Sequence, residues 1–210
     1  MIKSVSPDLV ALQEVDFQTN RAKKMDLVTE LGKLTEMAPL FGKAMKYDDG
    51  EYGEGILSKF TFNQTKTHPL PHSPDHEPRA ALAANVTLSF DEEIVFVGTH
   101  FDHTGDQTDR INQAKKINKI FKDTNYPTIL AGDLNATPGS EPIKILTQFW
   151  VDVTASNPEP TMPSSEPKSK IDYILFYPKE RWRVIETKVI QDKVASDHCG
   201  LLVVLELLEQ

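Results

Sequence analysis

The sequence feature that most constrains the fold is a short apolar run, Ile129–Ala131, followed by Gly132-Asp133-Leu134-Asn135. The run is too short for a helix and lies between turn residues, so it predicts a buried strand. Because side chains alternate along a strand, Asp133 and Asn135 point the same way. Two oxygen-bearing groups at the C-terminal end of a buried strand suit a divalent cation or a phosphate-bound water. The same residues also fit an ordinary Asx turn.

Four other strand boundaries carry polar side chains of catalytic type. The short strand Leu9–Leu12 runs into Glu14, and the strand Ile94–Thr99 runs into His100. Two further strands follow this pattern near their starts, Ile171–Phe176 with Asp172 and Leu201–Leu207 after Asp197-His198. Each case alone fits a surface acid or a hydrogen-bonded histidine. Five cases in one chain favour a shared site over turn composition.

The remaining hydrophobic periodicity predicts alternating helices and strands. A helix that begins with Thr108 as N-cap carries Ile111, Ala114, Ile117, Ile120 and Phe121 on one face, and it leads into the Asp133 strand as a βαβ-like crossover. Met1–Ser6 is expected to be the last part of a helix. A second helix carries Leu27, Leu31, Leu34 and Met37 on its apolar face and ends before Pro39. A third helix is expected at Glu141–Phe149, after Ser140. The other expected strands are Phe41–Tyr47, Ile56–Phe62, Arg79–Phe90 and Trp182–Ile190.

The segment Thr67–Pro78 holds His68, His72 and His76 together with four prolines. The histidine spacing suggests a metal site, but the prolines exclude a helix that would align the three imidazoles. We therefore predict a solvated loop here and no structural zinc site in this segment. A second loop at the surface is predicted for Pro158–Lys170, which has no apolar period.

Composition bounds the class of protein. With 210 residues and no segment that reads as a linker, residues 1–210 are expected to form a single domain. The net charge of −8 argues against broad adhesion to nucleic acid or anionic membranes, although a local basic patch is compatible with it. The single cysteine, Cys199, excludes an internal disulfide and is compatible with a reducing compartment.

The sequence contains no run long enough to cross a bilayer and no apolar signal-peptide core at its N-terminus. We expect a cytoplasmic protein from the chain as given. A secreted or periplasmic protein is the alternative if a signal peptide precedes Met1.

With these strand-end residues in this order, the chain resembles the endonuclease/exonuclease/phosphatase superfamily, which has the DNase I-like fold. The resemblance runs from Asp8 to the C-terminus and rests on the segments Pro7–Val15, Gly98-Thr99-His100, Gly132–Asn135, Lys170–Ile174 and Ser196-Asp197-His198. It implies an α/β four-layer sandwich, in which two mixed β-sheets lie face to face, helices flank them, and the active site lies at one edge.

The resemblance also implies roles for these residues. Glu14 would bind a divalent cation, Mg²⁺ or Mn²⁺, with Asp197 in the same pocket, and hard oxygen ligands agree with that choice of metal. Asp133 and Asn135 would position the attacking water and help to deprotonate it. The general base remains open between Asp133 and His198.

His100 and His198 would bind the scissile phosphate, and Asp172 would orient His198. Arg79 and His103 are further candidates for substrate binding. For Arg79 a surface salt bridge is an equally good interpretation, while His103 and the neighbouring Asp102 would shape the substrate pocket.

We therefore predict a metal-dependent phosphoesterase that uses direct water attack on a phosphodiester or phosphomonoester. Nucleases, inositol-phosphate phosphatases and enzymes acting on lipid head groups all belong to the superfamily, so the substrate stays open. The acidic balance favours a small phosphorylated molecule or head group over long duplex DNA. The alternative is a non-catalytic phosphate-binding relative with an incomplete metal site.

One part of the family pattern is absent. The family begins with a strand that ends in an asparagine of the metal site, then a loop and a helix, and this sequence has no asparagine before Glu14. A shortened or misplaced start, a partner chain that completes the missing N-terminal strand, and a degenerate non-catalytic relative are the three explanations.

Overall fold

The computed structural model describes residues 1–88 and 91–209. Within them the helices are α1 (Ile2–Val5), α2 (Leu27–Thr35), α3 (Thr108–Phe121) and α4 (Glu141–Leu146), with a 3₁₀ turn at Lys179–Arg181. The strands are β1 (Leu9–Phe17), β2 (Ala38–Tyr47), β3 (Gly50–Ser58), β4 (Phe62–Pro69), β5 (Ala80–Thr87), β6 (Glu93–His100), β7 (Thr128–Asp133), β8 (Val151–Asp152), β9 (Asp172–Tyr177), β10 (Trp182–Ile190) and β11 (Gly200–Leu207). In these described ranges, no helix is both long and apolar enough to span a membrane.

A six-stranded mixed sheet forms the centre of the molecule, with the strand order β4-β5-β6-β7-β9-β8. Only the β6–β7 pair in this sheet is parallel, and α3 connects these two strands. This confirms the predicted crossover, because parallel neighbours need a long connection that returns the chain to the same edge.

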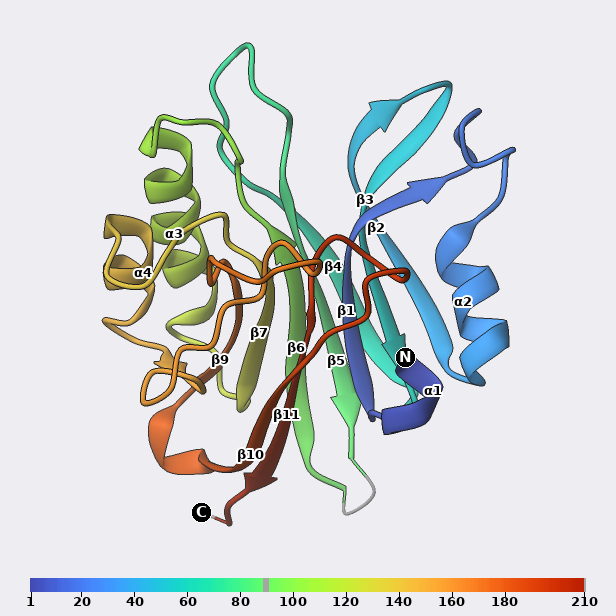
Figure 1. The fold of residues 1–210 in the computed structure, drawn as a ribbon. Coiled ribbons are helices and arrows are strands. Elements are labelled where there is room, and N and C mark those ends of the chain that lie inside the picture. The colour runs from blue at the N-terminus through green and yellow to red at the C-terminus, as the bar shows by residue number, and fades with distance from the viewer. Residues whose placement is uncertain (89–90, 210) are drawn as a thin grey trace.

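The layers are stacked as helices, sheet, strands and helix (Figure 1). Side chains alternate along β5, so that Ala81 and Ala83 pack under α3 and α4, while Leu82 and Ala84 face the second strand layer. That layer comprises the antiparallel sheets β1-β3-β2 and β10-β11, and α2 covers its outer side through Val28. The predicted four-layer α/β sandwich is confirmed, although pairing in the second layer is antiparallel among the described residues.

A groove of about 1800 Å³ lies between the two parts of the second layer. Its walls include β1 and β11, and inward-facing side chains of the central sheet such as Phe96, Ile129 and Ala131 also line it. Each of β1 and β11 has one strand neighbour among the residues described, so the outer backbone groups of both edges lack a strand partner there. Completion of this layer by a partner strand stays a prediction.

The structure corrects several predicted boundaries. The bounds of the strand expected at Ile56–Phe62 are wrong, because β3 ends at Ser58 and Phe62 is the first residue of β4. Thr108 is the first residue of α3 and not its N-cap, and its backbone N–H donates to Asp106 Oδ1 at 3.0 Å. Leu34, expected on the buried face of α2, is 66% exposed.

Two other expected elements differ at their ends. The strand predicted at Arg79–Phe90 is β5, Ala80–Thr87, and the positions 89 and 90 lie outside the described residues. The helix predicted at Glu141–Phe149 ends at Leu146. The strands β10 and β11 and the hairpin of β5 with β6 lie where they were predicted.

The contact between β6 and β7 gives the first testable prediction. A Cβ atom added to Gly132 would lie 1.9 Å from the carbonyl oxygen of Thr99, so Gly132→Ala forces the two strands apart. We expect a loss of about 2–3 kcal/mol in unfolding free energy, as for other overpacked sites. Urea unfolding measures the loss, and Gly105→Ala is the control because no atom lies within 4 Å of its Cβ position. Equal stability of the two variants would contradict the strand contact.

Candidate active site

Three neighbouring strands deliver the central side chains of the candidate site. In the parallel pair His100 lies opposite Asp133, and in the antiparallel pair Asp133 lies opposite Asp172. The three residues therefore form a row across β6, β7 and β9 at one end of the sheet. Their convergence follows from strand register, since the positions are far apart in the sequence.

His100 is buried and held from two sides. Arg79 Nη1 donates to His100 Nδ1 at 3.1 Å, so in the neutral ring the proton lies on Nε2. His100 Nε2 faces Asp133 Oδ2 at 3.5 Å. The side-chain Nδ2 of Asn135 lies 3.0 Å from Nε2 and donates to the carbonyl oxygen of Phe101 at 3.1 Å. Burial, followed by the positive charge of Arg79, lowers the pKa of His100 well below its usual value. His100 is therefore a neutral donor toward the site.

Asp133 is a buried carboxyl group at the end of β7. Burial raises its pKa to about 7, and the negative charges of Asp172 and Glu14 act in the same direction. The backbone N–H of Asn135 donates to Asp133 Oδ1 at 2.8 Å and opposes this shift. Asn135 has the left-handed φ of 46°, which asparagine tolerates well. A carboxyl group with this pKa can accept a proton near neutral pH.

His198 and Asp172 form the charged half of the site. Asp172 Oδ2 lies 2.9 Å from His198 Nδ1, and this hydrogen bond is the main reason that the pKa of His198 rises to about 9. His198 Nε2 points toward Asp133 Oδ2 at 4.0 Å. The site thus holds a protonated imidazole beside a carboxyl group that titrates near neutrality, as an acid–base reaction needs.

Glu14 reaches the same site from the second layer. The register of β1 shifts between Leu12 and Val15, and Glu14 has a left-handed φ of 58° within this bulge. The bulge places Glu14 Oε1 4.0 Å from His100 Nε2. Bulges often redirect a side chain beside an active site, and strained non-glycine residues such as this one cluster at functional sites.

Asp197 is the predicted residue that the structure separates from this cluster. It is exposed, and the described side-chain contact of its carboxylate is with Ser196 Oγ at 3.5 Å. Asp197 does line the large groove together with Glu14, Asp133 and His198. Its predicted role as a metal ligand with Glu14 stays a prediction.

Arg79 and His103 lie beside His100. Arg79 is 3% exposed, and its Nη2 contacts His103 Nδ1 at 3.0 Å and Glu77 Oε2 at 2.9 Å. Arg79 is therefore a buried side chain that supports two histidines, and the interpretation as a surface salt bridge is wrong. His103 is more than half exposed and remains a candidate for substrate contact.

Two buried ionisable side chains that sequence reasoning missed, Glu54 and Tyr52, lie near the site. Glu54 in β3 is 2% exposed, its Oε2 has no hydrogen-bond partner, and burial raises its pKa well above the usual value. Tyr52 is also buried, and burial followed by the charge of Glu14 raises its pKa. The only sequence signal for Glu54 is a charge between two glycines in an apolar strand, Gly53-Glu54-Gly55-Ile56.

The acidic groups fit a divalent cation. The negative charges of Asp133 and Glu14 each raise the pKa of Glu54, and Glu14 also raises that of Asp133. Oxygen or nitrogen atoms of Asp133, Asp172 and His198 lie within 4.8 Å of one another. Repelling carboxylates at one place are what a bound cation relieves, and carboxylate oxygens suit Mg²⁺ or Mn²⁺.

Comparison with known families gives a match over nearly the whole chain. The sequence model of the Endonuclease/Exonuclease/phosphatase family matches residues 1–198. This family depends on divalent metal ions, and the acidic and histidine clusters of the structure are compatible with that requirement.

Solved structures support the same fold. A protein of unknown function from Enterococcus faecalis is 23% identical with a TM-score of 0.81, and the match covers 99% of this chain and 88% of that one. A mannosyl-6-phosphatase from Bacteroides thetaiotaomicron is 17% identical with a TM-score of 0.75, covering 99% and 88%. The catalytic domain of human Nocturnin with bound sulfate is 18% identical with a TM-score of 0.76, covering 99% and 83%.

The raised pKa of Asp133 predicts a stability effect. Asp133 titrates near 7 in the folded protein and about 3.9 when unfolded. The ionisation of Asp133 therefore lowers the free energy of unfolding as the pH rises from about 4 to 7, and this loss is complete above pH 7. In EDTA, Asp133→Asn should add on the order of 2 kcal/mol to the unfolding free energy at about pH 8 and much less at about pH 4.5.

Urea unfolding at the two pH values measures this difference. Asn keeps an oxygen that accepts from the N–H of Asn135, so the variant removes the charge and retains the contact. A gain of equal size at both pH values would contradict the proposed electrostatic cause.

Proposed function

Because this chain belongs to the endonuclease/exonuclease/phosphatase family, we propose that it is a metal-dependent phosphoesterase. It hydrolyses a phosphodiester or phosphomonoester by direct attack of water. The observation that carries the proposal is the pair Asp133 and His198, whose Oδ2 and Nε2 lie 4.0 Å apart and whose pKa values are both raised, to about 7 for Asp133 and about 9 for His198. Paired groups with separated pKa values mark acid and base roles.

In this proposal Asp133 is the general base. Its carboxylate takes a proton from water while the water oxygen forms a bond to phosphorus and the bond from phosphorus to the ester oxygen breaks. Asn135 orients the water from the adjacent position. His198, kept protonated by Asp172 before the reaction, stabilises charge on the phosphoryl oxygens and donates its proton to the leaving oxygen. The proton that Asp133 takes from water then passes to solvent or to His198, which restores the starting state.

His100 contributes a neutral donor. Its Nε2–H faces the same space as Asp133, and the buried guanidinium of Arg79 fixes the tautomer from the other side. A preorganised donor in a buried position stabilises developing charge with little reorganisation. His103, exposed beside Arg79, is proposed to contact the non-reacting part of the substrate.

Glu14 is the proposed first ligand of an Mg²⁺ or Mn²⁺ ion, with Asp197 as the second. When bound, this ion neutralises phosphoryl oxygens of the substrate. The charges of Asp133 and Glu14 raise the pKa of Glu54, and Glu14 also raises the pKa of Asp133, which supports a cation at this place.

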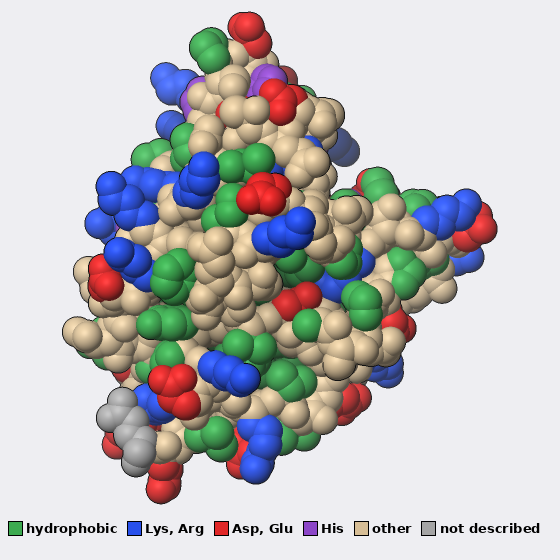
Figure 2. Space-filling view, turned by 90° about the vertical axis from the view of Figure 1, so that its left-hand side faces the viewer, with side chains coloured by type: hydrophobic (Ala, Val, Ile, Leu, Met, Phe, Trp, Pro, Cys, Tyr) green, Lys and Arg blue, Asp and Glu red, His purple; other side chains and the backbone are tan. Residues whose placement is uncertain are grey.

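A small phosphorylated molecule is the proposed substrate class. The net charge is −8, and on the face over α3 and α4 basic side chains are interspersed with acidic and hydrophobic ones (Figure 2). Such a mixed surface is unlike the continuous basic stripe of a duplex-binding protein. The structural similarity to a mannosyl-6-phosphatase agrees with a phosphorylated small molecule.

A non-catalytic phosphate-binding protein is the second candidate function. It is favoured by one observation, the exposed position of Asp197 outside the cluster of Asp133, Asp172 and His198. Phosphate binding without turnover would distinguish it from the enzyme.

Hydrolysis of p-nitrophenyl phosphate and bis-p-nitrophenyl phosphate tests the proposal. With Mg²⁺ or Mn²⁺ we expect turnover that EDTA abolishes and that falls at least about 100-fold in Glu14→Ala and in His198→Ala, because each removes charge stabilisation. His72→Ala is the matched control, since His72 is exposed in a loop and should retain full activity. The preferred ester separates a diesterase from a phosphatase.

Two results would count against the enzyme. Turnover that persists in EDTA contradicts the metal requirement. Folded protein that binds inorganic phosphate in calorimetry but hydrolyses neither ester, with metal present, supports the non-catalytic candidate.

The pH profile gives a separate prediction. The rate kcat/KM should rise as Asp133 loses its proton near pH 7 and fall as His198 loses its proton near pH 9. Asp172→Asn removes the main cause of the raised pKa of His198, so the alkaline limb should move to lower pH by about one unit or more. An unchanged alkaline limb in this variant would assign that limb to another group.

A further inference from the structure

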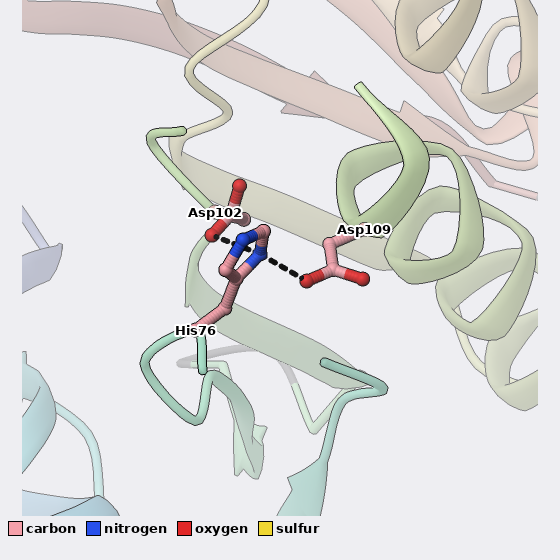
Figure 3. A group of neighbouring side chains, drawn as sticks. All are labelled: His76, Asp102 and Asp109. Atoms are coloured by element: carbon pink, nitrogen blue, oxygen red, sulfur yellow. Dashed lines mark hydrogen bonds and ion pairs between the residues drawn. The ribbon is translucent and has the colours of Figure 1, made fainter. Parts of the chain in front are cut away.

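A second cluster of metal-ligating side chains lies outside the candidate active site. His76 comes from the loop between β4 and β5, Asp102 from the segment after β6, and Asp109 from the first turn of α3. His76 Nδ1 lies 2.7 Å from Asp109 Oδ2 and 3.5 Å from Asp102 Oδ1 (Figure 3). One ligand atom from each residue lies within 4.8 Å of the others.

Asp102 has one satisfied and one unsatisfied oxygen. The residue is 0% exposed, and its Oδ2 accepts hydrogen bonds from the backbone N–H and the hydroxyl of Thr104. Its Oδ1 has no hydrogen-bond partner and faces the ring of His76 at 3.5 Å, which is too long for a hydrogen bond. A buried carboxylate oxygen left in this way requires an explanation, and a bound ion is one of the few available.

The charge of the cluster points to a cation. Asp102 and Asp109 are both buried, and the positive group nearest to Asp102 is Arg110, whose Nη1 lies 3.7 Å from Oδ2. The two buried carboxylates carry one more negative charge than the guanidinium of Arg110 balances. Burial of an unbalanced charge is costly, so a cation is favoured at the unsatisfied oxygen.

We propose that His76, Asp102 and Asp109 bind a Zn²⁺ ion. One imidazole and two carboxylates are ligands that zinc accepts, and three protein ligands leave a fourth position for water. The imidazole nitrogen favours a transition metal over Mg²⁺, which prefers oxygen alone. This site is therefore distinct in chemistry and in residues from the proposed Mg²⁺ or Mn²⁺ site at Glu14.

The site fastens the loop before β5 to the rest of the fold. Ser73 in this loop also donates to Asp109, through its backbone N–H at 2.8 Å and its hydroxyl at 2.9 Å. Glu77 follows His76 directly, Arg79 follows two residues later, and Arg79 contacts both Glu77 and His100. A metal ion here holds the segment that places Arg79 behind His100.

The other two histidines of the loop do not join the site. His68 lies in β4 and packs edge-on against Phe121 with ring centroids 5.7 Å apart, while His72 is exposed. The sequence predicts no structural zinc site in this segment, and the proposed site departs from that prediction because two of its three ligands, Asp102 and Asp109, come from outside the segment. The expectation of a fully solvated loop is wrong for His76, whose ring contacts two buried carboxylates.

Zinc binding tests the proposal in a Glu14→Ala background, which removes the proposed first ligand of the other metal site. Protein stripped with EDTA is titrated with Zn²⁺ by calorimetry, and the metal retained after dialysis is measured. We expect one equivalent bound in Glu14→Ala, and binding weaker by at least about 100-fold when His76→Gln is added, because a direct ligand is lost. Adding His72→Gln in place of His76→Gln should leave binding unchanged.

A spectroscopic measurement identifies the ligands independently. Co²⁺ in the site should give visible absorption bands of a tetrahedral complex, and these bands should be absent with His76→Gln or with Asp109→Asn. Circular dichroism confirms that each variant is folded, and both substituted side chains lie in or beside the loop and not in the sheets.

Two outcomes would overturn the proposal. If the Glu14→Ala protein binds no Zn²⁺, the cluster is held only by the direct contacts of His76 with the two carboxylates. If the His76→Gln and His72→Gln variants bind Zn²⁺ equally, the metal lies at another place.

Discussion

The pairing of β7 with β6 on one side and with β9 on the other is the constraint on which the site depends. It places His100, Asp133 and Asp172 in a row, although they are far apart in the sequence. The close approach of Gly132 to Thr99 belongs to the same pairing and is possible because glycine lacks a Cβ atom. A slip of one residue in β7 would turn Asp133 to the opposite face, so register and chemistry are set together.

The site concentrates charges that the fold would otherwise avoid. Burial and neighbouring carboxylates raise the pKa of Asp133 and of Glu54, while the positive charge of His198 opposes this at Asp133 and that of Arg79 opposes it at Glu54. The packing of the two strand layers and their helices must therefore compensate this unfavourable concentration of charge. Such an opposition between stability and function is common at active sites, and it explains why the polar groups meet where two well-packed layers hold them.

The sequence predicts the central parts of the fold because they have local signals. The apolar run before Asp133, the helical period of α3 and the alternation in β5 each depend on burial of one face, and burial leaves a periodic trace in the sequence. The polar residues at strand ends were identified for the same reason, since each interrupts such a pattern. The β3 boundary was missed because Gly50–Gly55 contains three glycines and two acids, a composition that favours a turn.

Contacts between segments that are distant in the sequence produce no periodic pattern in it. Nothing local to Glu54 shows that it is buried near Asp133, and nothing local to Arg79 shows that it lies behind His100. The loop Pro158–Lys170 was expected at the surface, yet Thr161, Ser164 and Lys170 in it are buried. Polar side chains bury where distant partners satisfy them, so their positions follow from the assembled fold and not from the sequence pattern around them.

The loop before β5 connects the two clusters physically. Its prolines remove backbone donors, so it cannot be held by a regular ladder and depends on side-chain contacts for a fixed conformation. His76 and Ser73 supply those contacts through Asp109, and Arg79 extends the ordered segment to His100. Because Arg79 Nη1 donates to His100 Nδ1, the contacts of His76 and Ser73 with Asp109 order a segment that leaves the proton of neutral His100 on Nε2.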